Sequence, residues 1–133
     1  MVTLDTNVVL RIVYKDDPAQ ADLAVTSWRR AAKAGGVFLT ETVLVELAWV
    51  LRAAAKFGRS DVAAALRHLC QSVDITVQNE AIVLAALERY EVGPADFSDY
   101  LILEEASAAR ALPVVTFDRE FAQEPEVELA LHG

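Results

Sequence analysis

The chain alternates short apolar stretches with longer stretches in which apolar residues recur at helical spacing. A short apolar run beside turn residues is typical of a buried strand, and VTLD at residues 2–5 is the first of these. Further extended segments are expected at 37–40, 74–77 and 114–117. The intervening pattern predicts helices over residues 7–14, 19–34, 43–57, 61–73, 79–92 and 100–112.

Residues that start and stop helices support this division. The acid followed by proline at Asp17-Pro18 is typical of a first helical turn, and the pair Gly35-Gly36 is typical of a helix end. Gly58 and Gly93 are expected to end later helices in the same way. The expected N-caps of the later helices are Thr40 or Thr42, Ser60, and Asp96 or Ser98.

Strands that alternate with helices through short connections predict an α/β fold around a mainly parallel sheet. The sequence has no linker, repeat or low-complexity tract, so we expect a single domain over residues 1–133. In such sheets, ligand sites gather beyond the carboxyl ends of the strands. Asp5 and Asp118 each follow a predicted strand, so they would share one edge of the sheet if those two strands are neighbours.

The composition favours a compact protein inside the cell. Apolar residues make up 54% of the chain, and the mean hydropathy is +0.28. No apolar run approaches the roughly 18 residues that span a bilayer, and the N-terminus lacks the basic segment and cleavage site of a signal peptide. The single cysteine, Cys70, cannot form an intramolecular disulfide. We therefore expect a cytoplasmic protein without a membrane partner.

The net charge is −8, and the isoelectric point is about 4.7. This charge argues against a protein that grips nucleic acid with a basic face, because phosphate contacts supply most of such binding. The net charge is still compatible with an enzyme that acts on nucleic acid, if bound metal ions neutralise some of its acidic residues. The loose groups of Lys and Arg are more typical of solvated helix faces than of a binding patch.

Two acids lie on predicted helices with no basic residue within helical reach. Glu46 is surrounded by VLVELAWVL, and Asp99 has Asp96 as its charged neighbour. An ionised carboxylate on such a face requires a partner from elsewhere in the fold, or a metal ion. The simpler explanations are a solvated polar strip for Glu46, a first-turn acid for Asp99 and an N-cap for Asp96.

The two acids at strand ends also have simple explanations, because Asp5 suits a helix cap and Asp118 suits a turn. These simple explanations do not account for the repulsion that would arise if all four acids lay close together, namely Asp5, Glu46, Asp99 and Asp118. Four carboxylates gathered at one sheet edge repel one another unless a divalent cation binds them. Oxygen ligands suit Mg²⁺ or Mn²⁺, and two histidines with one cysteine make a zinc site a poor alternative.

Four segments in this order resemble the PIN domain, and specifically the toxin of a VapBC-type toxin–antitoxin pair. They are VTLDTNVVL, TETVLVELAWVLR, ADFSDYLILEEA and VVTFDREF, which together extend from residue 3 to about residue 121. The resemblance implies a three-layer α/β/α sandwich with a short, mainly parallel central sheet. It also implies an endoribonuclease that depends on Mg²⁺ or Mn²⁺.

By motif position, the resemblance makes Asp5, Glu46, Asp99 and Asp118 the catalytic and metal-binding acids. Glu41 is the competing choice for the second acid, but it is expected to precede the helix. The supporting residues implied by the resemblance are Asn7, which would orient Asp5, with Thr6, Thr116 and the auxiliary acid Asp96. Tyr100 stands where many members have alanine, and we expect it to narrow the groove.

The family resemblance further implies a toxin that hydrolyses RNA and thereby inhibits translation or growth. It implies a homodimer and a cognate VapB-type antitoxin that covers the site. The low overall basicity suggests a defined substrate such as a tRNA or rRNA loop. The alternatives are a degenerate PIN domain that acts as a non-catalytic binding module, and a metal-dependent phosphatase. The phosphatase requires a second aspartate where Asn7 stands.

Overall fold

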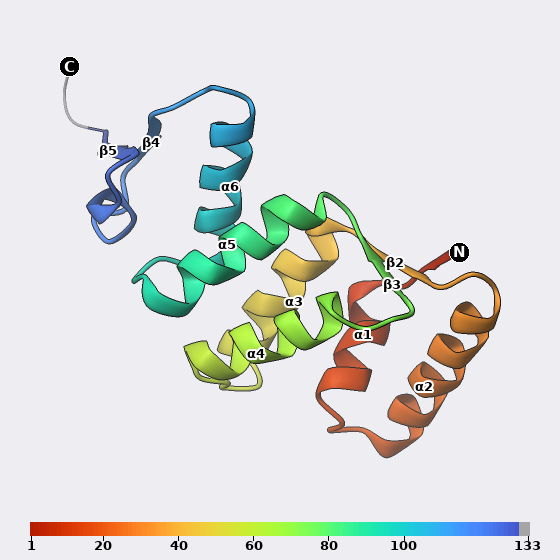
Figure 1. Ribbon diagram of the computed structural model, residues 1–133. Coiled ribbons are helices and arrows are strands. Elements are labelled where there is room, and N and C mark those ends of the chain that lie inside the picture. The colour runs from red at the N-terminus through yellow and green to blue at the C-terminus, as the bar shows by residue number, and fades with distance from the viewer. Residues whose placement is uncertain (131–133) are drawn as a thin grey trace. The chain divides into compact units, whose positions relative to one another are not determined.

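A computed structural model describes residues 1–130 of the chain (Figure 1). The described chain divides into two compact units: an N-terminal unit, Met1–Glu80, and a C-terminal unit that begins at Ala81. The elements of the first unit are β1 (Val2–Thr3), α1 (Thr6–Val13), α2 (Pro18–Lys33), β2 (Val37–Leu39), α3 (Glu41–Ala53), α4 (Arg59–Cys70) and β3 (Ile75–Val77). The remaining elements are α5 (Glu80–Val92), α6 (Phe97–Ala108), β4 (Val114–Thr116), the 3-10 helix η1 (Phe121–Gln123) and β5 (Val127–Leu129).

The N-terminal unit is built on a three-stranded parallel sheet in the order β1-β2-β3. Val37 in β2 is paired with Val2 on one side and Ile75 on the other. Parallel neighbours require crossover connections, which the helices supply. α2 packs beside β2 and α4 beside β3, while α1 contacts both α2 and α3 (Figure 1). This confirms the predicted α/β fold with a parallel sheet flanked by helices.

The core of this unit is aliphatic and comes from the apolar faces of its helices and from β2. β2 is buried at both ends, whereas both residues of β1 are exposed. The expectation of a buried first strand is therefore wrong, because β1 is the edge strand of this sheet. The fully buried side chains include Val9, Val37, Leu39, Leu44, Leu47, Leu51 and Leu66.

Two glycines turn the chain from α2 into β2. Gly35 and Gly36 have φ values of +101° and +105°, a region that side chains other than glycine rarely adopt. A Cβ at Gly36 would also lie 2.8 Å from the carbonyl oxygen of Asp74. The N–H of Val37 donates to that same carbonyl at 2.7 Å, so the turn fixes where β2 begins.

The boundary between α3 and α4 differs from the expectation in two ways. α3 ends at Ala53, before the glycine at 58, and Lys56 has a left-handed φ of 61° in the connection. α4 begins at Arg59 with Gly58 as its N-cap, so the predicted Ser60 cap is wrong. The carbonyl of Gly58 accepts the first helical hydrogen bond from Val62 at 3.0 Å, which leaves Ser60 inside the first turn.

The C-terminal unit contains α5, α6 and a two-stranded parallel sheet formed by β4 and β5 (Figure 1). Asp96 is the N-cap of α6, as one of the two expected alternatives has it. α6 ends at Ala108 rather than at 112, and Arg110 has a left-handed φ of 58°. β5 and η1 lie outside the predicted elements, because VEL is too short to show a period and its strand exists through pairing with β4.

One arginine joins three segments of this unit. Arg89 in α5 contacts Glu104 in α6 at 2.7 Å through Nε, and its guanidinium also pairs with Glu126 just before β5. The hydrogen bonds that Arg89 donates, first to Glu126 and then to Glu104, raise the pKa of Arg89, and Arg89 in turn lowers the pKa of Glu126. The ring of Tyr90 packs edge-on against Phe97, with centroids 6.2 Å apart.

No helix within residues 1–130 is long and apolar enough to cross a membrane.

Candidate metal centre

Asp5 and Glu46, which are far apart in the sequence, meet at one threonine in the N-terminal unit. Asp5 is the N-cap of α1, and its Oδ1 accepts a hydrogen bond from the backbone N–H of Thr6 at 2.8 Å. The hydroxyl of Thr6 donates to Oε1 of Glu46 in α3 at 3.1 Å. Thr6 is buried, whereas both carboxylates are exposed. The two acids therefore face solvent from a shared, buried support.

This arrangement shows which group Glu46 contacts, although no basic residue lies three or four positions from it on α3. Its partner is the neutral hydroxyl of Thr6, which can donate a hydrogen bond but cannot balance a negative charge. Asp5 is the N-cap of α1, which confirms the simpler explanation that this residue is a helix cap. The cap uses one carboxylate oxygen, so the two explanations of Asp5 are compatible. The oxygen-rich pair suits a hard cation such as Mg²⁺ or Mn²⁺.

Glu41, the competing second acid, does not precede the helix as expected. It is the first residue of α3, where Thr40 is the N-cap and accepts from Val43 N–H at 3.1 Å. Its own N–H donates to Oε1 of Gln78 at 3.0 Å. Its Oε1 is buried and has no hydrogen-bond partner among residues 1–130. Glu41 and Glu46 thus differ in accessibility and in partner.

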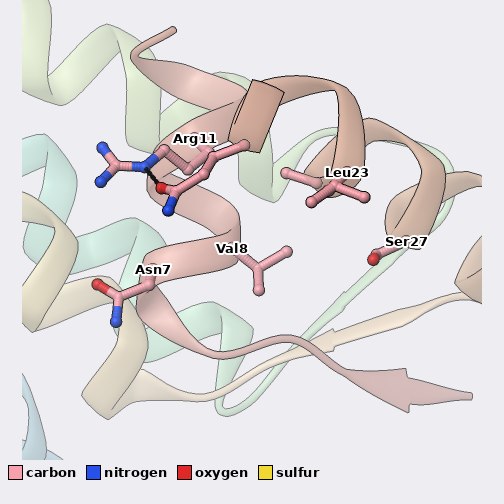
Figure 2. A pocket seen from close by; sticks show the side chains of 7 residues that line it. Asn7, Val8, Arg11, Leu23 and Ser27 are labelled. Atoms are coloured by element: carbon pink, nitrogen blue, oxygen red, sulfur yellow. Dashed lines mark hydrogen bonds between the residues drawn. The ribbon is translucent and has the colours of Figure 1, made fainter. Parts of the chain in front are cut away.

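Asn7 is exposed and lines a groove of about 230 Å³ between α1 and α2 (Figure 2). The side chains of Val8 and Leu23 form apolar parts of this groove, and Leu23 is 69% exposed. Arg11 also lines it and donates to Gln20 at 2.6 Å and to Asp16 at 2.7 Å. The hydrogen bond that orients Asp5 comes from the backbone of Thr6, so the orienting role of Asn7 stays a prediction.

In the C-terminal unit, Asp99 lies half-buried in the first turn of α6. Its Oδ2 accepts a hydrogen bond from the backbone N–H of Asp96 at 3.1 Å. Burial raises the pKa of Asp99, the hydrogen bond from Asp96 lowers it, and the charges of Asp96 and Asp118 raise it again. The net effect is a raised pKa. A carboxylate placed under these conditions gains from a nearby cation, because the cation favours the ionised form.

Asp118 forms the turn after β4. Its Oδ1 accepts from Glu120 N–H at 2.8 Å and from Phe121 N–H at 3.3 Å, while its own N–H donates to Thr116 Oγ1 at 3.0 Å. Thr116 and Asp118 therefore hold each other in the TFD segment. The prediction that Asp118 is a turn residue is confirmed. The residue is also exposed at the end of the strand, so a role as a metal ligand stays a prediction.

The four predicted acids are thus divided, with Asp5 and Glu46 in one unit and Asp99 and Asp118 in the other. In neither unit does the described chain bring three Asp, Glu, His or Cys side chains into a cation site. A shared sheet edge for Asp5 and Asp118 is expected if their strands are neighbours. In the described chain they are not, because β1 belongs to the sheet β1-β2-β3 and β4 to the sheet β4-β5. A common four-acid centre therefore stays a prediction.

The expectation that Tyr100 narrows a groove is wrong. The side chain is fully buried, with its hydroxyl donating to Oε1 of Glu124 at 2.8 Å. Neither this hydrogen bond nor the pairing of Arg89 with Glu126 can be inferred from the sequence. The partners are 24 and 37 residues apart, and no periodic pattern connects them. Gly93, which makes room for the hydroxyl, is the available signal.

A comparison with curated proteins finds no match. The family model of the PIN domain matches residues 2–126, which includes all four predicted acids and nearly the whole chain. The match extends over both units, and the parallel α/β architecture of the chain is consistent with the PIN fold. The chain therefore belongs to the PIN-domain family.

Proposed function

We propose that this protein is a metal-dependent endoribonuclease, the toxin of a VapBC-type pair, which hydrolyses RNA to inhibit translation or growth. PIN domains are typically nucleases. The observation that carries the proposal is the hydrogen-bonded series from Asp5 through Thr6 to Glu46. It joins two exposed acids of the family motifs on a buried support, which is the arrangement expected of metal ligands rather than of unrelated surface acids.

The donor set fits Mg²⁺ or Mn²⁺. Asp5, Glu46, Asp99 and Asp118 supply only carboxylate oxygens, and Asp99 already has a raised pKa that a cation would lower. A divalent cation at these acids supplies an electrophilic centre that activates water and offsets the charge of the phosphodiester. Thr6 holds Asp5 and Glu46 in place, and Thr116 and Asp96 do the same for Asp118 and Asp99.

The proposed substrate is a defined RNA, such as a loop of tRNA or rRNA. The net charge of −8 argues that bulk RNA is bound weakly, because few phosphates can be neutralised by the protein itself. Recognition then depends on shape and on unpaired bases. Tight, sequence-independent retention of RNA in a gel shift at moderate salt without metal would contradict this substrate class.

We further propose a cognate antitoxin and a second copy of the chain as protein partners. The groove between α1 and α2 supports an antitoxin site, since it has an exposed apolar wall at Leu23 and begins at Asn7, two residues from Asp5 (Figure 2). An antitoxin segment seated there would lie next to a proposed metal ligand. A free, buried Cys70 is consistent with a cytoplasmic location.

The test is cleavage of an RNA panel with Mg²⁺ or Mn²⁺ by four proteins: wild type, Asp5→Asn, Glu46→Gln and Glu41→Gln. Asn caps helices as well as Asp, so Asp5→Asn removes a charge while leaving α1 capped. Gln still accepts from Thr6, so Glu46→Gln also isolates the charge. We expect both variants to lose at least about a hundredfold in rate, and Glu41→Gln to cleave like wild type.

Several outcomes would refute the proposal. Wild type that cuts no RNA with either metal favours the non-catalytic binding module, and equal cleavage by Asp5→Asn removes the assigned mechanism. Loss of activity in Glu41→Gln with retention in Glu46→Gln would exchange the two glutamates. A DNA panel separates a deoxyribonuclease, and a phosphate-ester substrate separates the phosphatase.

A further inference from the structure

Tyr100 connects two segments of the C-terminal unit that carry its two predicted acids. Its hydroxyl donates to Glu124 Oε1 at 2.8 Å and accepts a hydrogen bond from the backbone N–H of Ala95 at 3.4 Å. Its ring packs edge-on against Phe121, with centroids 6.2 Å apart and planes at 79°. The side chain is fully buried. One residue of α6 therefore contacts both the loop before α6 and the chain after β4.

The surrounding sequence is shaped to admit this hydroxyl. A Cβ at position 93 would lie 1.8 Å from the hydroxyl oxygen of Tyr100 and 3.0 Å from the carbonyl oxygen of Arg89. Only glycine leaves that space, so the requirement at position 93 is close approach. A buried hydroxyl also costs free energy unless it is hydrogen-bonded, and here it has both a donor and an acceptor as partners.

The acceptor of the tyrosine hydroxyl is itself fixed. Oε2 of Glu124 lies 3.7 Å from Nη1 of Arg89, while its Oε1 receives the hydroxyl of Tyr100. The Glu124 side chain is 21% exposed. Arg89 is anchored in turn by Glu104 and Glu126. The position of Glu124 therefore depends on two directed contacts, and the chain around η1 is held against α6.

Asp99 and Asp118, the two predicted acids of this unit, are each linked to the contacts of Tyr100 by a hydrogen bond or by adjacency in the sequence. Asp99 is the neighbour of Tyr100, and its carboxylate accepts from Asp96 N–H, next to Ala95. Asp118 accepts from the N–H of Phe121, the residue whose ring packs on Tyr100. Tyr100 thus contacts segments that flank both acids.

From these contacts we propose that Tyr100 is a positioning residue: through Glu124, Ala95 and Phe121 it fixes the carboxylates of Asp99 and Asp118 relative to each other for a divalent cation. The inference rests on the proposed metal-dependent function. A preorganised pair of ligands binds a cation more tightly than a mobile pair, because less conformational freedom is lost on binding. A tyrosine that merely fills the core would need its ring and not its hydroxyl.

The experiment measures Mn²⁺ binding to the full-length, metal-free protein by titration calorimetry without RNA. Tyr100→Phe keeps the ring and removes the hydroxyl. Glu124→Ala removes the acceptor, and Glu124→Gln keeps one. Tyr90→Phe is the matched control, since it deletes the hydroxyl of another buried tyrosine in the same unit. All titrations are run well below the melting temperature, with near-UV circular dichroism to verify the fold.

We expect Tyr100→Phe and Glu124→Ala to bind Mn²⁺ about tenfold more weakly, and Glu124→Gln and Tyr90→Phe to remain within about twofold of wild type. Wild-type affinity in folded Tyr100→Phe, or in Glu124→Ala if the former does not fold, overturns the inference. Equal weakening in Tyr90→Phe also overturns it, because the effect is then general.

Failure of the proposed function has a different signature. In that case wild type itself binds no Mn²⁺, or Asp5→Asn and wild type bind it equally.

Discussion

Thr6 forms hydrogen bonds with two acids of the N-terminal unit that are far apart in the sequence. Its backbone N–H contacts Asp5 and its hydroxyl contacts Glu46, so it serves both from a buried position. The sequence marks Thr6 only as a polar residue after the first acid. The partner of its hydroxyl, Glu46, is a finding of the structure.

Replacing Thr6 by valine tests this contact. Valine has nearly the same shape, so the substitution leaves packing intact and removes one hydrogen bond, at a cost of about 1 kcal/mol in the free energy of unfolding. We expect RNA cleavage to fall about tenfold, because Glu46 loses its orienting partner. Thr6→Ser keeps the hydroxyl and should remain within about twofold of wild type. Urea denaturation and initial cleavage rates measure the two effects.

The result would contradict the assignment if Thr6→Val cleaves RNA at the wild-type rate while it shows the expected loss of stability. The hydroxyl would then support the fold and not Glu46.

Among the elements, helix starts are easier to predict than helix ends. Asp17 and Thr40 cap their helices with a side-chain hydrogen bond, and these signals lie in the residues themselves. The ends of α3 and α6 fall three or more residues before the predicted ones. In each case the chain leaves the helix through a residue with positive φ, Lys56 or Arg110, that no glycine marks.

α4 starts without any side-chain cap, because Gly58 occupies the N-cap position. Its φ of −70° and ψ of 164° are those of an ordinary cap, and a Cβ there would meet only Asp61 Oδ2 at 3.7 Å. Gly58→Ser should therefore stabilise the protein by about 0.5–1 kcal/mol, through a cap hydrogen bond and a less flexible unfolded chain. Thermal and urea denaturation measure the change.

Gly93→Ser is the contrasting variant. Its Cβ has no room beside the hydroxyl of Tyr100, so we expect destabilisation by about 1–3 kcal/mol. Equal effects of the two glycine substitutions would contradict this account of the space around them.

At the scale of the whole molecule, the net charge of −8 means that acidic side chains outnumber basic ones, so ion pairs such as those of Arg89 offset repulsion between carboxylates. Arg89 is the cation that joins α5, α6 and the segment before β5, with partners at Glu104 and Glu126. Because Arg89 hydrogen-bonds Glu126, the pKa of Glu126 lies below its ordinary value. A carboxyl whose pKa is lower in the folded state stabilises the protein above its unfolded pKa and loses that contribution as pH falls.

We therefore expect the acid limb of the stability curve to become shallower in Glu126→Gln. Wild type should lose the contribution of this group as pH falls below about 4.3, the ordinary pKa of glutamate, and through the lower folded value. Glutamine does not titrate, so the variant is less stable at pH 7 and converges toward wild type at low pH. Urea denaturation from pH 7 to pH 3 measures this; a constant difference between the proteins would contradict it.

Much of this protein can be predicted from its sequence, because the relevant signals are local. The period of apolar residues predicts most of the strands and helices, and caps such as Asp17 and Thr40 mark where helices begin. The unusual position of Glu46, an acid on an apolar helix, indicates by itself a partner outside that helix. The four segments around Asp5, Glu46, Asp99 and Asp118 indicate by their order the family, which the match over residues 2–126 confirms.

Contacts between distant residues are decided only by the tertiary structure. The hydroxyl of Thr6 reaches Glu46 across 40 residues, and the hydroxyl of Tyr100 reaches Glu124 across 24. No periodicity encodes such pairs, since they depend on how whole elements pack. The same holds for β5, a three-residue strand that forms because β4 offers it a hydrogen-bonding edge. The preference of a segment for helix or strand is set by residues close to it in the sequence. Hydrogen bonds between side chains of distant segments form only when the whole chain has packed.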